Sequence, residues 1–132
     1  GNLTMASADK SGILKIQRAL KNSELVGMLP DQDPGVEGGI MAPFFNTKAN
    51  TMTLLAKIAK KNDLQVLIFW AKRLPRGEGY ELNLEPVDLN INGDTLEGQV
   101  ASMNQCVENL IRKMPEQYMW SYKRFKSTHS YG

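Results

Sequence analysis

The fold depends on the stretch Leu29-Pro30-Asp31-Gln32-Asp33-Pro34-Gly35, which Gly38-Gly39 follows closely. The apolar run that leads into this stretch predicts a short strand over residues 24–29. The prolines, glycines and aspartates that follow favour turns and break regular structure, so that strand is not expected to continue. In open α/β sheets, ligands bind outside the carboxyl ends of the strands. The loop that carries Asp31 and Asp33 is therefore the first candidate site.

Three helices are predicted from the spacing of the apolar residues. The first spans residues 11–22, and the second begins at Asn50 or Thr51 and ends near residue 61. The third opens with the capping-box pattern Asp94-Thr95-Leu96-Glu97, in which the aspartate is the cap, and Pro115 stops it.

Residues 64–71 form a continuous apolar run, which is typical of a strand covered on both faces in a parallel sheet. With the strand at 24–29 and the helix between them, this run predicts a βαβ unit with a right-handed crossover. Apolar and polar side chains alternate in residues 80–84, after a turn at 75–79, which predicts an antiparallel edge strand with one solvent-exposed face. Residues 40–45 are expected to form an apolar loop.

These elements place the chain in the α/β class, with a single domain over residues 1–132. The expected sheet is small and mixed, with about three strands, room for further short ones, and flanking helices. Such a sheet is small for a domain with helices on both faces. Either the domain is minimal or part of its sheet is missing from this chain.

Composition excludes or disfavours several classes of function and site. The net charge of +2 and the pI near 8.7 are too mild to argue for nucleic acid. The single cysteine, Cys106, excludes an internal disulfide and a cysteine-based metal cluster, and its helical setting predicts a buried structural thiol. No apolar stretch reaches the ~18 residues of a membrane-spanning helix. No secretory signal opens the sequence, so a cytoplasmic protein is expected.

The loop at residues 31–39 has two interpretations. Asp31 and Asp33 are close enough in sequence to share a cation, a sugar or amine ligand, or a proton, and the glycines could leave amides free for an anion. A calcium loop is excluded because its twelfth position, Ala42, carries no acid. The alternative is a tight turn whose aspartates cap backbone amides.

Two basic regions leave similar alternatives open. Lys72-Arg73, with Arg76 nearby, would lie on the same sheet edge as Asp31 and suit a phosphorylated sugar, or would simply be a solvated hairpin end. Residues 115–126 interleave aromatic and basic side chains, which suits a membrane interface, an anionic lipid or single-stranded nucleic acid. Alternatively, their aromatic rings pack on the core.

Several of these motifs occur together in one protein family. They are the opening stretch with Gly38-Gly39 and Ala42-Pro43-Phe44-Phe45, Thr53 with the helix after it, Arg73-Leu74-Pro75 with Gly77 and Gly79-Tyr80, and Pro115-Glu116-Gln117-Tyr118-Met119-Trp120 with Lys123-Arg124-Phe125-Lys126. Over residues 10–127 the chain resembles the second half of the bacterial lipid A biosynthesis acyltransferases. These are the lauroyl and myristoyl transferases of the lysophospholipid acyltransferase superfamily.

The resemblance implies part of a glycerol-phosphate-acyltransferase-like fold and a role in lipopolysaccharide biosynthesis. Family members move a fatty acyl chain from an acyl carrier protein thioester to a hydroxyl of a lipid A precursor, at the cytoplasmic face of the inner membrane. They use His-x4-Asp/Glu, in which the histidine is the general base, and no cofactor. His129, the single histidine, cannot supply this motif because the acid would fall at position 134 of 132.

The resemblance therefore implies the C-terminal half of such an enzyme, without the family's N-terminal membrane anchor. We expect the isolated chain to be soluble and inactive, whether it is an expressed fragment or a truncated copy. A sheet edge that the other half normally covers would favour self-association. The alternative is a non-catalytic module that binds lipid or carrier protein, and the mild net charge argues against a nucleic-acid partner.

Matching positions imply roles for individual residues. Asp31 would support catalysis near the acceptor head group, and the other substrate-binding positions are Asp33, Arg73, Phe44 and Phe45. Arg73 would contact phosphate or the acyl carrier, and the two phenylalanines would line an acyl channel. The positions implied to meet anionic head groups or the membrane are Lys123, Arg124, Lys126 and Trp120. Tyr122 stands where the family often has histidine, which leaves the polar contact there in doubt, and no metal site is implied.

Overall fold

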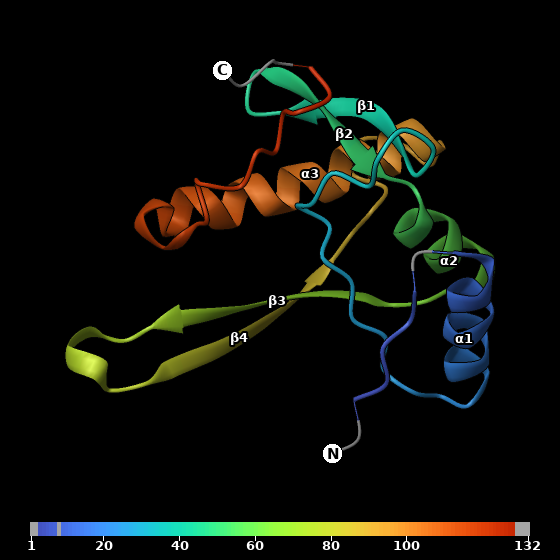
Figure 1. The fold of residues 1–132 in the computed structure, drawn as a ribbon, viewed down its shortest axis with the longest axis horizontal. Helices are drawn as coiled ribbons and strands as arrows, with labels where there is room; N and C mark the ends of the chain where they lie inside the picture. Colours follow the sequence, from blue (N-terminus) through green and yellow to red (C-terminus); the bar gives the residue numbers. More distant parts are fainter. Residues whose placement is uncertain (1–2, 8, 129–132) are drawn as a thin grey trace.

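The computed structural model describes residues 3–7 and 9–128, which form three α-helices and two β-hairpins (Figure 1). The helices are α1 (Lys10–Lys21), α2 (Leu54–Asn62) and α3 (Leu96–Lys113), and the strands are β1 (Gly39–Phe44), β2 (Thr47–Met52), β3 (Val66–Arg73) and β4 (Tyr80–Val87). The expected α/β class is confirmed. The strands, however, form two separate antiparallel pairs, β1–β2 and β3–β4, rather than one mixed sheet.

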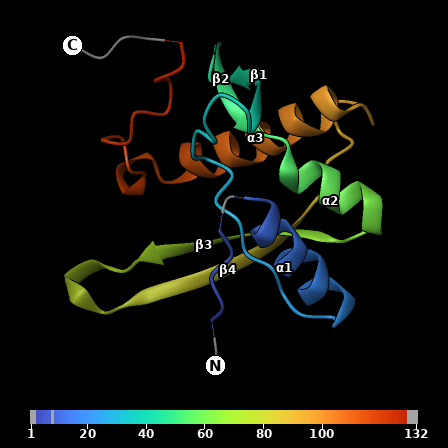
Figure 2. The same cartoon turned by 45° about the vertical axis from the view of Figure 1, so that its right-hand side comes forward.

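Helix α3 is the central element of the structure. The β1–β2 hairpin lies on one side of it and the β3–β4 hairpin on the other (Figures 1 and 2). The helix begins one residue later than predicted, because the side chain of Thr95, not that of Asp94, accepts the Gly98 N–H, at 3.1 Å. Its apolar positions lie in three adjoining core clusters, whose buried members are Phe44, Ala49, Val107 and Ile111; Ala42, Ala56 and Val100; and Ala59, Leu89 and Met103.

The prediction of a loop at residues 40–45 is wrong, because most of these residues form strand β1. A two-residue turn of Phe45 and Asn46, with φ of 48° and 41°, joins β1 to β2. Both residues are left-handed, as a type I′ turn requires, but Asn-Gly is the usual sequence there and Phe is not. Tertiary contacts hold the turn: the Phe45 N–H donates to Glu108 Oε1 at 2.9 Å, and the Arg112 guanidinium lies 5.0 Å from the ring centre.

The predicted start of the second helix is also wrong. Asn50 and Thr51 belong to β2, and α2 begins at Leu54, so the polar residues taken for a helix cap are buried strand residues. The predicted end of the helix is confirmed, at Asn62. Asp63 then leaves the helix in a left-handed conformation, with φ of 48°.

The predicted βαβ unit does not form. Residues 24–29 pass between α1 and the loop without pairing to any strand in the described part of the chain. Strand β3 overlaps the run predicted at 64–71 but begins at Val66 and extends to Arg73, and it pairs antiparallel with β4, with Phe69 opposite Leu84. The predicted alternating strand at 80–84 is confirmed within β4.

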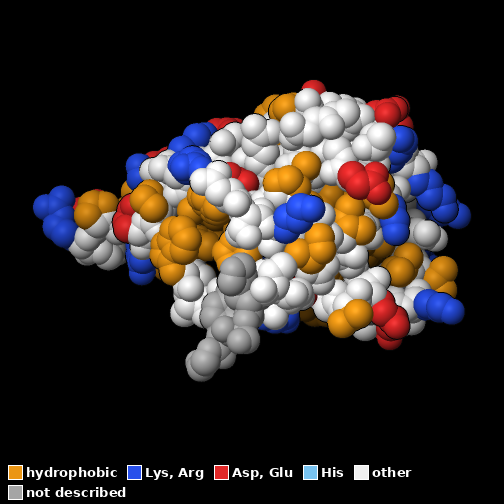
Figure 3. Space-filling model, turned by 90° about the horizontal axis from the view of Figure 1, so that it is seen from above, with side chains coloured by type: hydrophobic (Ala, Val, Ile, Leu, Met, Phe, Trp, Pro, Cys, Tyr) orange, Lys and Arg blue, Asp and Glu red, His pale blue; other side chains and the backbone are white. Residues whose placement is uncertain are grey.

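Strand β3 is not covered on both faces as its sequence predicts. On one face of the β3–β4 hairpin, Phe69 is 61% exposed and Leu84 is 64% exposed. The hairpin tip projects from the rest of the structure (Figure 1), and Lys and Arg side chains lie at that end (Figure 3). Self-association through an exposed sheet edge stays a prediction.

Buried polar side chains tie β2 to α3 and to the C-terminal segment. Asn104 Nδ2 donates to the Pro43 carbonyl oxygen at 2.8 Å and to Thr51 Oγ1 at 3.0 Å. The Arg124 guanidinium donates to the Asn50 carbonyl oxygen at 2.6 Å and to Thr51 Oγ1 at 2.9 Å. Since buried polar groups need partners, this network requires β1, β2, α3 and the C-terminal segment to lie in one arrangement.

Replacing Asn104 by alanine removes both of its donated bonds and leaves the Pro43 carbonyl oxygen without that donor. Leaving a buried polar group unsatisfied costs about 1–3 kcal/mol, so we expect the free energy of unfolding in urea to fall by about that amount. The matched control is Asn109→Ala at an exposed position of α3, which should change it by less than about 0.5 kcal/mol. Equal losses in the two variants would contradict the role of the network.

Candidate functional site

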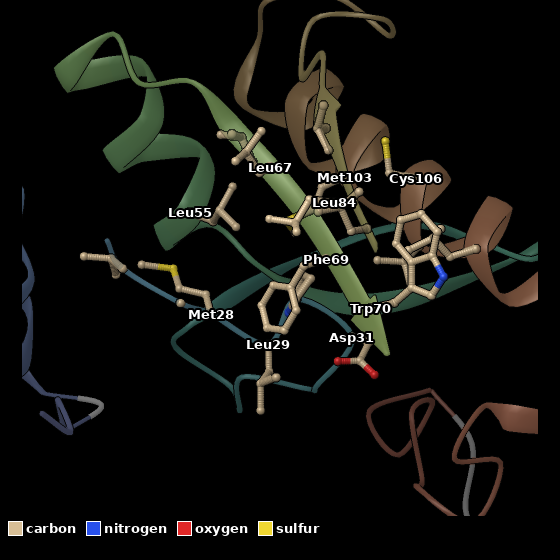
Figure 4. A pocket seen from close by; sticks show the side chains of 18 of the residues that line it. Met28, Leu29, Asp31, Leu55, Leu67, Phe69, Trp70, Leu84, Met103 and Cys106 are labelled. Atoms are coloured by element: carbon tan, nitrogen blue, oxygen red, sulfur yellow. The ribbon is translucent and has the colours of Figure 1, made fainter. Parts of the chain in front are cut away.

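An apolar cavity of about 580 Å³ lies between residues 24–31, α2, α3 and the β3–β4 hairpin (Figure 4). Its walls are mainly alkyl and aromatic side chains, among them Met28, Leu29, Leu55, Leu67, Phe69 and Met103. Pockets that bind small molecules are typically ~300–1,000 Å³ and mostly apolar with a few polar groups. The cavity therefore has the size and character of a site for an apolar ligand.

The cavity explains two features of the sequence. The apolar run at residues 24–29, which predicted a strand, instead lines one wall of the cavity. Residues 64–71, which predicted a strand covered on both faces, supply the facing wall through β3. Both runs are apolar because they border this space rather than because they pair as parallel strands.

Asp31 is half-buried and lies at one end of the cavity. Figure 4 shows it near the carboxyl end of β3, with Leu55 and Leu67 toward the other end. Tyr118 and Gln117, from the segment after α3, line the cavity together with Asp31. The structure therefore places Asp31 near the carboxyl end of β3, although residues 24–29, which lead to it, do not form the parallel strand that the sequence predicts.

Asp33 has different surroundings from Asp31. It is buried, and its carboxylate accepts hydrogen bonds from Ser127 Oγ at 2.7 Å, the Gly35 N–H at 2.8 Å and Asn50 Nδ2 at 3.1 Å. Burial by itself raises the pKa of Asp33, but these bonds and the charge of Lys126 outweigh it, so the net pKa is lowered. The geometry favours the tight-turn interpretation for this residue rather than direct contact with a ligand.

The backbone of the same loop is also held by protein groups. The Asp33 N–H donates to the Tyr122 hydroxyl at 2.7 Å, so tyrosine makes a polar contact at the position where the resemblance left one in doubt. A Cβ at Gly39 would collide with Asn50 Oδ1 and the Pro34 ring. The Gly38-Gly39 pair thus permits close packing of the loop against β2.

Arg73 is not brought to the cavity. Its side chain is exposed and outside the lining, while its backbone N–H donates to Gln117 Oε1 at 2.7 Å and its carbonyl oxygen accepts from Gln117 Nε2 at 3.2 Å. The expected shared edge with Asp31 depended on a parallel strand at 24–29, which does not form. Arg76, at the hairpin tip, pairs with Glu78 at 3.2 Å.

The two phenylalanines predicted to line an acyl channel lie outside the cavity lining. Phe44 is 2% exposed and packs in the core against Ala49, Val107 and Ile111. Phe45 packs edge-on against Phe44, with ring centres 4.9 Å apart. The structure does not place either ring on the cavity wall.

The four residues implied to meet head groups divide into two kinds. Arg124 is 3% exposed, and its guanidinium lies 5.2 Å from the centre of the Phe44 ring, so it faces the core rather than the solvent. Lys123, Lys126 and Trp120 are exposed. Figure 3 shows basic and hydrophobic side chains mixed on the face seen from above.

Cys106 is half-buried and lines the cavity. Burial, together with the nearby Asp88 and Glu85 carboxylates, raises the pKa of its thiol, which makes it a poor nucleophile.

Within residues 3–7 and 9–128, no three His, Cys, Asp or Glu side chains gather to hold a metal ion. None of the helices in those ranges is long and apolar enough to cross a membrane. His129 lies outside the described residues.

Sequence reasoning missed the roles of Gln117, Tyr118 and Cys106 in the cavity. Gln117 and Tyr118 belong to the motif Pro115-Glu116-Gln117-Tyr118, which marked the segment but not its position in the fold. The alternative of core packing is also realised, since Tyr118 and Phe125 pack against the core cluster that includes Phe44. No local pattern indicates that this segment faces Asp31.

Comparison with known proteins gives consistent matches. A family model described as "Bacterial lipid A biosynthesis acyltransferase" matches residues 2–127. The lipid A biosynthesis lauroyltransferase of Escherichia coli (strain K12) is 34% identical over 120 residues, covering 90% of this chain and 39% of that protein. The palmitoleoyltransferase of the same organism is 34% identical over 128 residues, covering 92% of the chain and 40% of that protein.

A lipid A biosynthesis acyltransferase of Haemophilus influenzae is 29% identical over 113 residues, with 86% of this chain and 35% of that protein covered. The chain thus spans about two fifths of the length of these relatives. The resemblance drawn from the residue motifs is confirmed.

Asp33→Asn should change how stability depends on pH. Because the pKa of Asp33 is lowered in the folded state, its ionised form stabilises the fold above the ordinary pKa of 3.8, and that contribution is lost as the pH falls through the folded value. We expect Asp33→Asn to be less stable than the wild type at neutral pH, with the difference shrinking below 3.8.

Urea unfolding across this pH range measures the effect. Ser127→Ala, which removes one of the bonds to the carboxylate, should give an intermediate result. An Asp33→Asn profile parallel to that of the wild type at every pH would contradict the prediction.

Proposed function

The chain belongs to the bacterial lipid A biosynthesis acyltransferase family, and from this premise we propose that its cavity holds a fatty acyl chain during transfer to a lipid A precursor. The observation that carries the proposal is the apolar cavity of about 580 Å³ with the carboxylate of Asp31 at one end. Burying each CH₂ group of an acyl chain in such a space gains about 0.8 kcal/mol. The polar end then receives the group at which chemistry occurs.

In this proposal the donor is an acyl carrier protein thioester and the acceptor is a hydroxyl of the lipid A precursor. The hydroxyl oxygen bonds to the acyl carbonyl carbon, the carbon–sulfur bond breaks, and the hydroxyl proton passes through a histidine base to the departing thiolate. That base belongs to the family's His-x4-Asp/Glu motif, which these 132 residues do not contain. Asp31 would serve this chemistry in a supporting role at the acceptor side.

The remaining residues either hold the loop or contact the partners. Asp33 holds the loop that carries Asp31, and its hydrogen bonds to other residues of the protein support this role. The exposed side chains of Arg73, Lys123 and Lys126 would meet phosphate, the acyl carrier or anionic head groups at the cytoplasmic face of the inner membrane. Trp120, which is also exposed, would lie at the same interface.

A second candidate is a non-catalytic module that binds lipid or carrier protein. The same cavity favours it, because an apolar cavity binds an acyl chain whether or not transfer follows. The two candidates differ in catalysis: the first requires Asp31 to affect transfer when the histidine motif is present, and the second does not.

The cavity proposal predicts that Phe69→Asp weakens binding of a fluorescent fatty acyl probe. Phe69 lines the cavity, and a carboxylate there would have to be desolvated when the probe binds, so we expect the dissociation constant to rise at least tenfold. The matched control is Leu82→Asp on the neighbouring strand, which is 70% exposed and does not line the cavity. Equal weakening in both variants, measured by fluorescence titration, would count against the cavity as the acyl site.

The missing histidine motif predicts no turnover by these 132 residues alone. Incubation with acyl carrier protein thioester and lipid A precursor should yield no acylated product by mass spectrometry, while the fluorescent acyl probe still binds. Robust turnover would contradict the assignment of the general base to the His-x4-Asp/Glu motif.

A further inference from the structure

Helices α1 and α2 carry an unusual share of the charge of this protein. Together they contain seven of the 16 lysine and arginine residues and none of the 14 aspartate and glutamate residues. We call these seven the basic patch: Lys10, Lys15, Arg18 and Lys21 in α1, and Lys57, Lys60 and Lys61 in α2. Because the whole chain has a net charge of +2, the two helices carry +7 and the other residues carry −5. The mild net charge is thus the balance of a strongly basic region and an acidic remainder.

The side chains of the basic patch are all exposed, and they lie at one end of the molecule. Helices α1 and α2 are neighbours there in both views of the fold (Figures 1 and 2), and Lys and Arg side chains are visible on the surface at that end (Figure 3). Among the salt bridges within the described residues, one involves the patch, between Lys60 and Asp94 at 3.9 Å. Like charges gathered in this way repel one another and attract a surface of opposite charge. The patch therefore suits an anionic partner.

Exposed apolar side chains accompany these charges. Leu14 is 61% exposed, and helical spacing places it one turn from both Lys10 and Arg18. In the segments that flank α1, Met5 is 77% exposed and Leu25 is 94% exposed. A helix that presents basic and apolar side chains together is typical of segments that lie in the interface of a lipid bilayer. An acidic protein surface would pair with the charges but would offer these apolar side chains no hydrocarbon to enter, so the pattern favours lipid.

The inner sides of the same two helices border the cavity. Leu20 of α1 and Leu55 of α2 line it, and Figure 4 shows Leu55 toward the end away from Asp31. The basic patch therefore covers the outside of one end of the cavity. A bilayer bound at the patch would lie next to that end.

We propose that α1 and α2 form a surface that docks on an anionic lipid bilayer, with the basic patch at the lipid phosphates and Leu14 at the boundary of the hydrocarbon. This inference rests on the proposed function in one respect, namely that the chain works at a membrane. It names a bilayer contact that is separate from the exposed residues of the C-terminal segment.

Sedimentation of the 132-residue chain with lipid vesicles tests the inference. Vesicles of phosphatidylglycerol and phosphatidylcholine in equal parts should bind the chain, vesicles of phosphatidylcholine alone should not, and added salt should weaken the binding because it screens the charges. Lys15→Glu combined with Arg18→Glu should lower the partition coefficient at least about 25-fold. The reason is that each basic residue near an anionic surface is worth about fivefold in binding.

The matched control is Lys48→Glu combined with Arg76→Glu, which makes the same change in net charge at two exposed positions outside α1 and α2. It should lower the partition coefficient by less than about threefold, because only the long-range, screened attraction changes. Leu14→Gln should lower it about tenfold, since the leucine no longer enters the hydrocarbon, and Leu82→Gln on β4, at a position 70% exposed, should have no such effect. Circular dichroism should show the same helix content in every variant.

Equal losses in the charge-reversed variant and its control, or no binding of the wild type to anionic vesicles, would overturn the inference. Binding to polyglutamate without binding to anionic vesicles would assign the patch to an acidic protein, and that result would overturn it as well. Titration of the fluorescent acyl probe without vesicles reports separately on the cavity. Loss of that binding in the wild type would contradict the proposed function, whatever the vesicles show.

Discussion

The structure depends on the burial of one charged side chain, Arg124. A guanidinium that is 3% exposed must have acceptors, because an unpaired buried charge costs several kcal/mol. The Asn50 carbonyl oxygen and Thr51 Oγ1, both from β2, accept from its terminal nitrogens, and the Asp33 carboxylate adds a nearby negative charge. Its Nε has no acceptor among the described residues. The C-terminal segment, the first hairpin and the candidate loop must therefore lie together, although they are distant in sequence.

This constraint separates the two aspartates of the loop. Asp33 is held through Asn50 and Ser127 and contributes to the fold. Asp31, two residues earlier, lies beyond this network and lines the cavity. A short loop can present one carboxylate to a ligand in a defined position only if its own backbone is held, and the neighbouring carboxylate and Tyr122 do that here.

The motif residues shared with the family accordingly fall into two groups. Phe44, Gly39 and Arg124 pack the core or hold the loop, and their sequence signal concerns the fold. Asp31 and Tyr118 line the cavity, and in the proposed function Asp31 is the residue that serves the ligand. A motif match by itself does not distinguish the two groups, because a buried structural residue and a binding residue both appear as a matched position.

The sequence by itself determined the three helices, strand β3 and the alternating strand β4, because these features arise from local periodicity and turn chemistry. Only the tertiary structure decided that residues 24–29 line a cavity instead of pairing as a strand, that Phe45 completes a hairpin turn against α3, and that Arg124 faces inward. The physical reason is that each of these outcomes depends on contacts between distant segments. A short apolar run fits a strand and a cavity wall equally well, and a basic residue in a surface-like pattern can be buried once distant acceptors surround it.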